Sequence, residues 1–150
     1  MPQAKKQPTI LMLDDDNEDI YLTRRAFCNY REDLIFNGVH CSSKMFDYLN
    51  CRGEFKENGP EHSPDIILLD INLPKENGFA ILEKLRTDKQ FGHIPVTMLT
   101  TSIACRDIQT AYSLGASSYI CKSVSSKGMQ EVAQQFCDYW FGFAKLPLAS

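Results

Sequence analysis

Acidic side chains follow two short apolar runs of the sequence. Asp14, Asp15 and Asp16 come directly after one run, and Asp70 comes directly after another. Carboxylates that meet at one place cannot all stay ionised unless a cation binds beside them or their pKa values rise. Because carboxylates offer only oxygen ligands, they favour a hard cation, and magnesium fits best. The pattern therefore predicts a magnesium site built around a reactive carboxylate.

Hydroxyl and amino groups follow two later apolar runs. Thr100 and Thr101 come after the first of these runs, and Lys122 comes after the second. Phosphoryl transfer to a carboxylate uses such a set: the carboxylate attacks phosphorus, while magnesium, a lysine and a hydroxyl take up charge on the phosphoryl oxygens. A carboxylate nucleophile needs no general base. The chemistry therefore requires none of the histidines, which lie away from these runs at His40, His62 and His93.

Five apolar runs are predicted to be β-strands that position these groups. They are short, and the middle ones are apolar almost throughout, as expected for parallel strands covered on both faces. The second run is the least clear. The runs are Thr9–Leu13, Leu34–Cys41, Ile66–Leu69, Val96–Leu99 and Tyr119–Cys121.

Segments with helical spacing lie between and after these runs. The clearest extends from Met129 to Trp140, where apolar residues recur at i, i+3, i+4, i+7, i+8 and i+11. A second runs from Cys105 to Tyr112, before a helix-ending Gly115, and a third follows Gly78. Weaker helical patterns cover 17–30 and 43–51, and a long polar loop follows over 51–64.

Five strand–helix pairs predict an α/β fold with a doubly wound, five-stranded parallel sheet and helices on both faces. Ligands of such sheets bind outside the carboxyl ends of the strands, which is where the acidic residues, Thr100 and Lys122 would meet. With 150 residues, a single domain is expected. We expect it to cover residues 9–141, with a disordered arm at 1–8 and a tail at 142–150 that is too short for an output domain.

Composition excludes several classes of protein. A hydrophobic content of 43% excludes intrinsic disorder of the body, and a net charge of -3 gives no reason to expect nucleic acid as a partner. No run is long enough to cross a membrane, and the start has no secretory signal, so a cytoplasmic location is predicted. The cysteines are widely spaced, which favours reduced, small core residues over disulfides; they are Cys28, Cys41, Cys51, Cys105, Cys121 and Cys137.

Four segments in order resemble the receiver domain of two-component response regulators, of the kind found in chemotaxis. They are ILMLDDD, PDIILLDINLPKENG, IPVTMLTTS and LGASSYICKS, and the match runs from Thr9 to Trp140. The DIxxAYxLGA spacing of Asp107–Ala116, the long loop before Pro64 and the aromatic end at Tyr139–Phe141 are similar to small stand-alone receivers that partner phytochrome-type histidine kinases. The resemblance implies a flavodoxin-like sheet of order 2-1-3-4-5 with five helices. It also implies phosphorelay signal transduction, with catalysis limited to the protein's own phosphorylation and dephosphorylation.

The resemblance implies a role for each acidic residue. Asp70 would accept the phosphoryl group from a phosphohistidine of a sensor histidine kinase. Asp15 and Asp70 would bind Mg2+ directly, Asp14 largely through water, and the backbone carbonyl of Asn72 would be a further ligand. For Asp16 we prefer a helix N-cap.

The resemblance also implies how the phosphoryl group would be sensed. Thr100 would turn its hydroxyl toward the phosphoryl group, Lys122 would pair with its charge, and Tyr119 would swing inward as a switch. Pro74 and Gly78 would shape the loop after the acceptor. Structural roles stay open beside these: Thr100 could simply end a strand, Lys122 could be a solvated surface lysine, and Tyr119 could be a fixed, half-buried aromatic.

Two positions depart from the family pattern. Ser123 stands where the family usually has a proline with a cis bond that aims the lysine inward, so the Lys122–Ser123 bond is either trans with a reshaped loop or cis. Thr101 is larger than the Ala or Gly often found after the switch hydroxyl. It is therefore expected to narrow the approach to Asp70.

Alternative functions and partners stay open at this point. A receiver that is never phosphorylated and acts only as a binding module is one alternative. An aspartyl-nucleophile phosphatase is less favoured, because it needs an acid where Asn72 stands. The aromatic residues of the chain end exceed what one helix face can bury, which predicts a homodimer contact or folding back onto the core; they are Phe136, Tyr139, Trp140, Phe141 and Phe143.

Overall fold

A computed structural model of the chain describes residues 7–59 and 62–147. Of the predicted arm at 1–8, residues 1–6 lie outside the described residues. The predicted tail at 142–150 lies outside them from residue 148 onward.

Five parallel strands form one sheet in the order β2-β1-β3-β4-β5, which confirms the predicted topology. The second strand is shorter than expected, because β1 ends at Leu13 and pairs there with Val39, so no partner strand continues beyond that point. The strands are β1 (Thr9–Leu13), β2 (Ile35–Val39), β3 (Ile66–Leu69), β4 (Val96–Thr100) and β5 (Ser118–Cys121).

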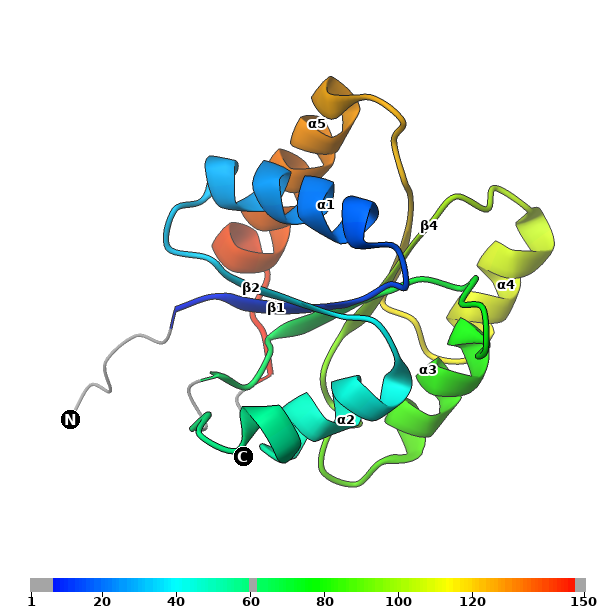
Figure 1. The fold of residues 1–150 in the computed structure, drawn as a ribbon. Coiled ribbons are helices and arrows are strands. Elements are labelled where there is room, and N and C mark those ends of the chain that lie inside the picture. Colours follow the sequence, from blue (N-terminus) through cyan, green and yellow to red (C-terminus); the bar gives the residue numbers. More distant parts are fainter. Residues whose placement is uncertain (1–6, 60–61, 148–150) are drawn as a thin grey trace.

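Helices cover both faces of the sheet, as predicted for a doubly wound fold (Figure 1). On one face lie α1 (Asn17–Tyr30) and α5 (Ser126–Cys137); on the other lie α2 (Ser42–Leu49), α3 (Gly78–Thr87) and α4 (Cys105–Ser113). In the part of the chain that the structure describes, no helix is both long and apolar enough to cross a bilayer.

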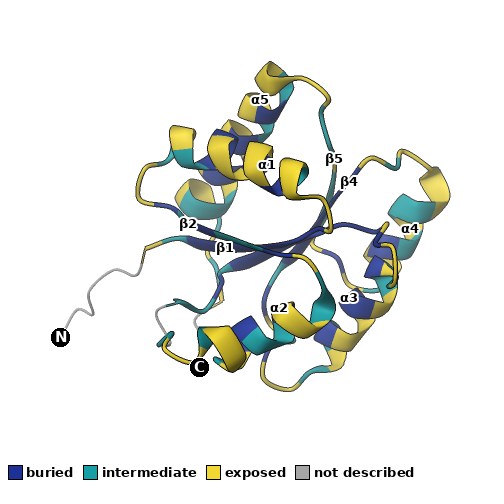
Figure 2. Cartoon of the chain, in the orientation of Figure 1, coloured by how far each residue is buried: buried dark blue, intermediate teal, exposed yellow. Residues whose placement is uncertain are grey.

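The central strands β1, β3 and β4 are buried on both sides because each face of the sheet carries its own apolar core (Figure 2). Along β1, Ile10 and Met12 pack with α1 and α5, while Leu11 and Leu13 pack with α2 and α3. Alternate side chains of a strand point to opposite faces, so a strand covered twice must be apolar throughout. This is why the runs could be recognised as strands.

Two helix ends follow the predicted local chemistry. Asp16 caps α1, since its side chain accepts hydrogen bonds from the backbone N–H groups of Glu18 and Asp19. Gly115 follows α4 with φ +101°, and the next N–H, of Ala116, reaches back to the carbonyl of Ala111. This is the Schellman arrangement, in which glycine takes the left-handed position at little cost.

The last predicted helix divides into two parts. The α-helix ends at Cys137, and a π-helical segment, η3 (Asp138–Phe143), follows it. Trp140 and Phe141 of this segment pack beside Phe136, with ring centroids 6.2 and 6.5 Å away. The aromatic end therefore folds back onto the core in part, as one of the two alternatives expected.

All six cysteines are free thiols, as predicted, but they are not all core residues. Cys137 is buried, whereas Cys105 and Cys121 are exposed. The prediction of a core position was wrong for these two, because Cys105 opens α4 and Cys121 ends the edge strand β5, where fewer neighbours cover the chain. Cys28, Cys41 and Cys51 are only partly buried.

Candidate functional site

The groups predicted to do chemistry lie at the carboxyl edge of the sheet. Asp14 and Asp70 follow β1 and β3, Thr100 ends β4, and Lys122 follows β5. Asp14, Asp70 and Thr100 are buried, while Asp15 is exposed at the rim. Parallel strands turn at this edge toward alternate helices, which opens the space where these side chains meet.

The Lys122 ammonium lies at the centre of the acidic groups. Its Nζ donates to Asp14 Oδ2 at 2.6 Å, to Asp19 Oδ2 at 2.8 Å and to Asp70 Oδ2 at 3.0 Å. Only 9% of the lysine side chain is exposed. The surface-lysine alternative is therefore wrong for Lys122, whose three donors all meet carboxylates.

Asp19 is a member of this site that the sequence did not indicate. It lies in the first turn of α1, three residues after the Asp16 cap. An acidic residue at that position is expected to interact with the N–H groups and the dipole of its own helix. The sequence therefore gives no separate indication of a contact with Lys122. The signal that could have found it is its place in the first turn of the helix that follows Asp14–Asp16, close to the sheet edge where Lys122 was predicted to lie.

Three carboxylates form a candidate cation site. One oxygen each from Asp14, Asp15 and Asp70 lies within 4.8 Å of the others. Oxygen donors in this number suit a hard divalent ion, which completes its shell with water and backbone carbonyls. The residues present therefore fit the predicted magnesium ion, with the first and third strands supplying the ligands.

Burial and hydrogen bonds set the charges of this site. Burial raises the pKa of the Asp14 carboxyl, and the hydrogen bond from Lys122 lowers it in part. Burial works against the charged form of Lys122, but its hydrogen bonds to Asp14, Asp19 and Asp70 raise the pKa of the ammonium above its ordinary value. Lys122 is therefore a fixed positive charge beside the carboxylates.

The loop after Asp70 is held close to the site. The Asn72 backbone N–H donates to Asp70 Oδ1 at 3.3 Å, and the Gly78 N–H donates to the Ile71 carbonyl at 2.9 Å. A Cβ on Gly78 would lie 2.2 Å from the Asp70 carbonyl oxygen, so only glycine fits. Pro74, also expected to shape this loop, is exposed within it.

Thr100 and Tyr119 lie on neighbouring strands with contrasting hydroxyl groups. Thr100 Oγ1 is buried without a hydrogen-bond partner among the described residues. Burying a hydroxyl without a hydrogen-bond partner costs free energy. The cost would be removed when a bound ligand accepts a hydrogen bond from this hydroxyl. The Tyr119 hydroxyl donates to the Ser102 carbonyl at 2.9 Å, and burial raises the pKa of this hydroxyl, so it stays protonated. Tyr119 thus ties β5 to the loop after β4.

The loop after Lys122 decides between a trans and a cis Lys122–Ser123 bond. The Lys122–Ser123 bond is trans. Ser123 Oγ accepts from the Ser125 N–H at 3.2 Å, and Ser125 Oγ accepts from the Gly128 N–H at 3.0 Å to cap α5. Serine side chains therefore shape this loop, and the lysine reaches the carboxylates without a proline after it.

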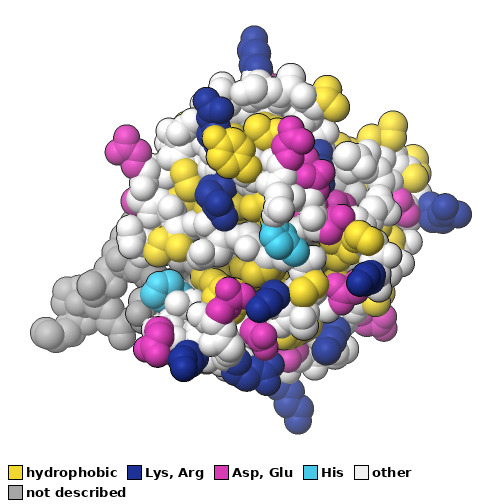
Figure 3. Space-filling model, viewed as in Figure 1, with side chains coloured by type: hydrophobic (Ala, Val, Ile, Leu, Met, Phe, Trp, Pro, Cys, Tyr) yellow, Lys and Arg dark blue, Asp and Glu magenta, His cyan; other side chains and the backbone are white. Residues whose placement is uncertain are grey.

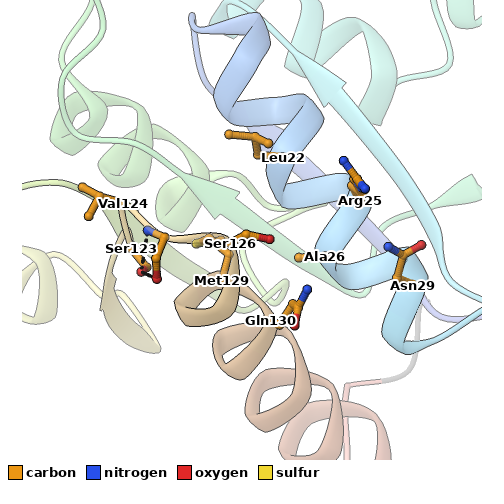
Figure 4. A pocket seen from close by; sticks show the side chains of 10 residues that line it. Leu22, Arg25, Ala26, Asn29, Ser123, Val124, Ser126, Met129 and Gln130 are labelled. Atoms are coloured by element: carbon orange, nitrogen blue, oxygen red, sulfur yellow. Dashed lines mark hydrogen bonds between the residues drawn. The ribbon is translucent and has the colours of Figure 1, made fainter.

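The surface near the site carries a hollow and mixed charges. A hollow of about 130 Å³ lies between α1 and the start of α5, and Figure 4 shows Leu22, Arg25 and Val124 on its walls. Arg25 is the one charged side chain among its lining residues. On the face drawn in Figure 3, Lys and Arg side chains are interspersed with Asp and Glu instead of forming one basic surface.

Comparison with known proteins gives concordant matches. The family profile described as response regulator receiver domain matches residues 10–134. A probable methanogenesis regulatory protein, FilR2 of Methanothrix harundinacea, is 32% identical over 97% of this chain and 91% of its own length. Response regulator Rcp1 of Synechocystis sp. is 30% identical over 98% of both chains. The crystal structure of the phosphorylated cyanobacterial phytochrome response regulator RcpA superposes with a TM-score of 0.83 at 31% identity, covering 95% of this chain and 99% of that one.

Proposed function

The chain belongs to the response regulator receiver domain family, and from this premise we propose that Asp70 is its phosphoacceptor. The protein accepts a phosphoryl group from a phosphohistidine of a sensor histidine kinase and signals through a change of its surface. The cation would be magnesium, which Asp15, Asp70 and the Asn72 carbonyl would hold directly and Asp14 largely through water. Its catalysis is limited to its own phosphorylation and dephosphorylation.

One observation carries this proposal: Lys122 Nζ contacts Asp70 and Asp14, and both carboxylates lie beside Asp15 in a group that can hold a cation. The candidate cation site and the positive charge of Lys122 thus both lie at the Asp70 carboxylate, the proposed nucleophile. An aspartyl phosphatase would also need a general acid near the nucleophile. Asn72, which stands two residues after Asp70, cannot supply one.

The transfer itself makes one bond and breaks one. An Asp70 carboxylate oxygen attacks phosphorus, the P–N bond of the phosphohistidine breaks, and the imidazole nitrogen keeps the electron pair. Lys122 shifts one N–H from the Asp70 oxygen to a phosphoryl oxygen, and Thr100 donates its unpaired hydroxyl to another. Bound magnesium would neutralise charge on the carboxylates and the phosphoryl group.

The signal leaves the site through the loop after β4. When Thr100 turns toward the phosphoryl group, residues 101–104 move with it, and the Tyr119–Ser102 hydrogen bond is exchanged as Tyr119 swings inward. The affected surface is formed by α4, β5 and α5. Phosphorylation thus shifts the population between two arrangements, since the phosphoryl group binds Thr100 and Lys122 better in one of them.

The likeness to RcpA, a cyanobacterial phytochrome response regulator, favours a phytochrome-type kinase as the donor. We also propose that the protein acts in the cytoplasm. We further propose that residues 9–141 form the receiver unit. A second copy of the chain, bound through the aromatic end, is the proposed partner on the output side.

Intact mass spectrometry after incubation with acetyl phosphate and MgCl2 tests the proposal. We expect the wild type to gain the mass of one phosphoryl group, and Asp70→Asn or added EDTA to abolish the gain. Asp16→Asn is the matched control, because asparagine keeps the α1 cap and the residue lies outside the cation group. No gain in the wild type would instead support a binding module, and hydrolysis of added phosphate esters would support a phosphatase.

A further inference from the structure

Asp19 contacts Lys122 from a helix, whereas the other two carboxylates that contact Lys122 follow strands. Its Oδ2 lies 2.8 Å from Lys122 Nζ, and it projects from the first turn of α1. Resting on the proposed function, we infer that Asp19 is a positioning residue: it keeps the Lys122 ammonium beside Asp70 when the cation and the phosphoryl group bind.

The three carboxylates that hold Lys122 are not equivalent. Asp14 and Asp70 also belong to the cation group, whereas Asp19 does not. A divalent ion bound by Asp14, Asp15 and Asp70 would compete for their oxygens and would repel the nearby ammonium. Among the described residues, Asp19 then remains the one carboxylate partner of the Lys122 ammonium that the cation would not share, so its importance is greatest in the loaded site.

Both ends of this ion pair are fixed by the backbone. The Asp19 carbonyl accepts from Thr23 Oγ1 at 2.7 Å, and the next residue, Ile20, is buried in the core under α1. On the other side, the Lys122 N–H donates to the Thr100 carbonyl at 2.8 Å. Groups held in this way need little reorganisation when the reaction occurs.

A purely local role at the helix end does not explain Asp19. An acidic residue three positions after an N-cap often accepts from the N–H of the cap residue. Here the Asp16 N–H already donates to Asp14 Oδ1 at 3.0 Å. The Asp19 side chain is instead directed to Lys122, with 35% of it exposed against 9% of the lysine.

The test measures the phosphorylation rate from acetyl phosphate as MgCl2 is raised to saturation. Asp19→Asn keeps the shape and removes the charge. We expect its plateau rate to fall about fivefold or more, while the half-saturating Mg2+ concentration changes less than about threefold, because Asp19 is not a ligand. Glu18→Gln is the matched control, since it removes an exposed charge from the same helix turn, and it should keep the wild-type rate.

A second measurement tests the pair without phosphorylation. In urea unfolding, Asp19→Asn, Lys122→Met and the double variant form a cycle. We expect the fold-reduction of the folding equilibrium constant in the double variant to be smaller than the product of the fold-reductions in the two single variants. A plateau rate of Asp19→Asn within twofold of the wild type or above it, or independent effects in the cycle, would overturn the inference. A wild type that takes up no phosphoryl group would overturn the proposed function instead.

Discussion

Thr101 stands exposed directly after the buried Thr100, at the rim of the site. We expect its methyl and hydroxyl groups to narrow the path that a small phosphoryl donor takes to Asp70. Thr101→Ala is therefore expected to speed phosphorylation by acetyl phosphate about threefold, which corresponds to roughly 0.6 kcal/mol in the barrier. Intact mass spectrometry over time measures this rate. Thr87→Ala, a similar change of an exposed threonine on α3, should leave it unchanged, and an unaltered rate for Thr101→Ala would remove the idea.

Single residues could be predicted where a strand end dictates their position. Asp14, Asp70 and Lys122 follow apolar strands, and parallel strands end at one edge, so the order of residues along the chain predicts that they meet. Asp19 could not be found in this way. Its contact depends on how α1 is rotated against the sheet, which is set by packing between helices and not by local sequence.

The first turn of α2 is capped by a residue from another loop. Cys41, its N-cap, makes no side-chain cap bond; instead the Ser42 N–H donates to Glu76 Oε2 at 2.9 Å, and the Ser42 hydroxyl also bonds to Glu76. Because Glu76 lies in the loop that follows Asp70, it ties this loop to α2. A carboxylate there also offsets the partial positive charge of the helix end.

Glu76→Ala should accordingly lower the free energy of unfolding by about 1–2 kcal/mol, the usual effect of losing a helix cap. A urea titration measures the change. Glu83→Ala, which removes an exposed glutamate from α3, should change stability much less. Equal stability of the two variants would show that the contact contributes nothing.

Elements that a local sequence pattern specifies could be predicted, whereas elements whose form depends on side-chain packing could not. The apolar run Ile66–Leu69 indicates a buried strand, and Gly115 marks a helix end by its own conformation. At the chain end the apolar spacing continues past Cys137, so it predicts one long helix. The observed π-helical turn depends on how Trp140 and Phe141 fit beside Phe136, which only packing decides.

At the scale of the whole molecule, two cores on opposite faces share one sheet, and the chain end extends the core on the α1 and α5 side. Arg31 of this side stacks over the Phe141 ring at 5.6 Å, and Leu146 packs against the same core. Removing residues from 141 onward would therefore disturb the core as well as any contact between copies. Point substitutions at the exposed aromatic residues test a homodimer more cleanly.

The exposed aromatic residues of the chain end are Tyr139 and Phe143, with exposed fractions of 51% and 81%. Their rings stack with the centroids 6.2 Å apart. Exposed aromatic pairs of this kind are typical of contacts between chains. We expect the wild type to have the mass of a dimer in light scattering and Tyr139→Ser with Phe143→Ser to have that of a monomer. Tyr21→Ser, which changes an aromatic residue of α1 that is 57% exposed, should remain dimeric. A monomeric wild type, or a double variant that stays dimeric, would exclude the chain end as the interface and leave these rings for a different partner.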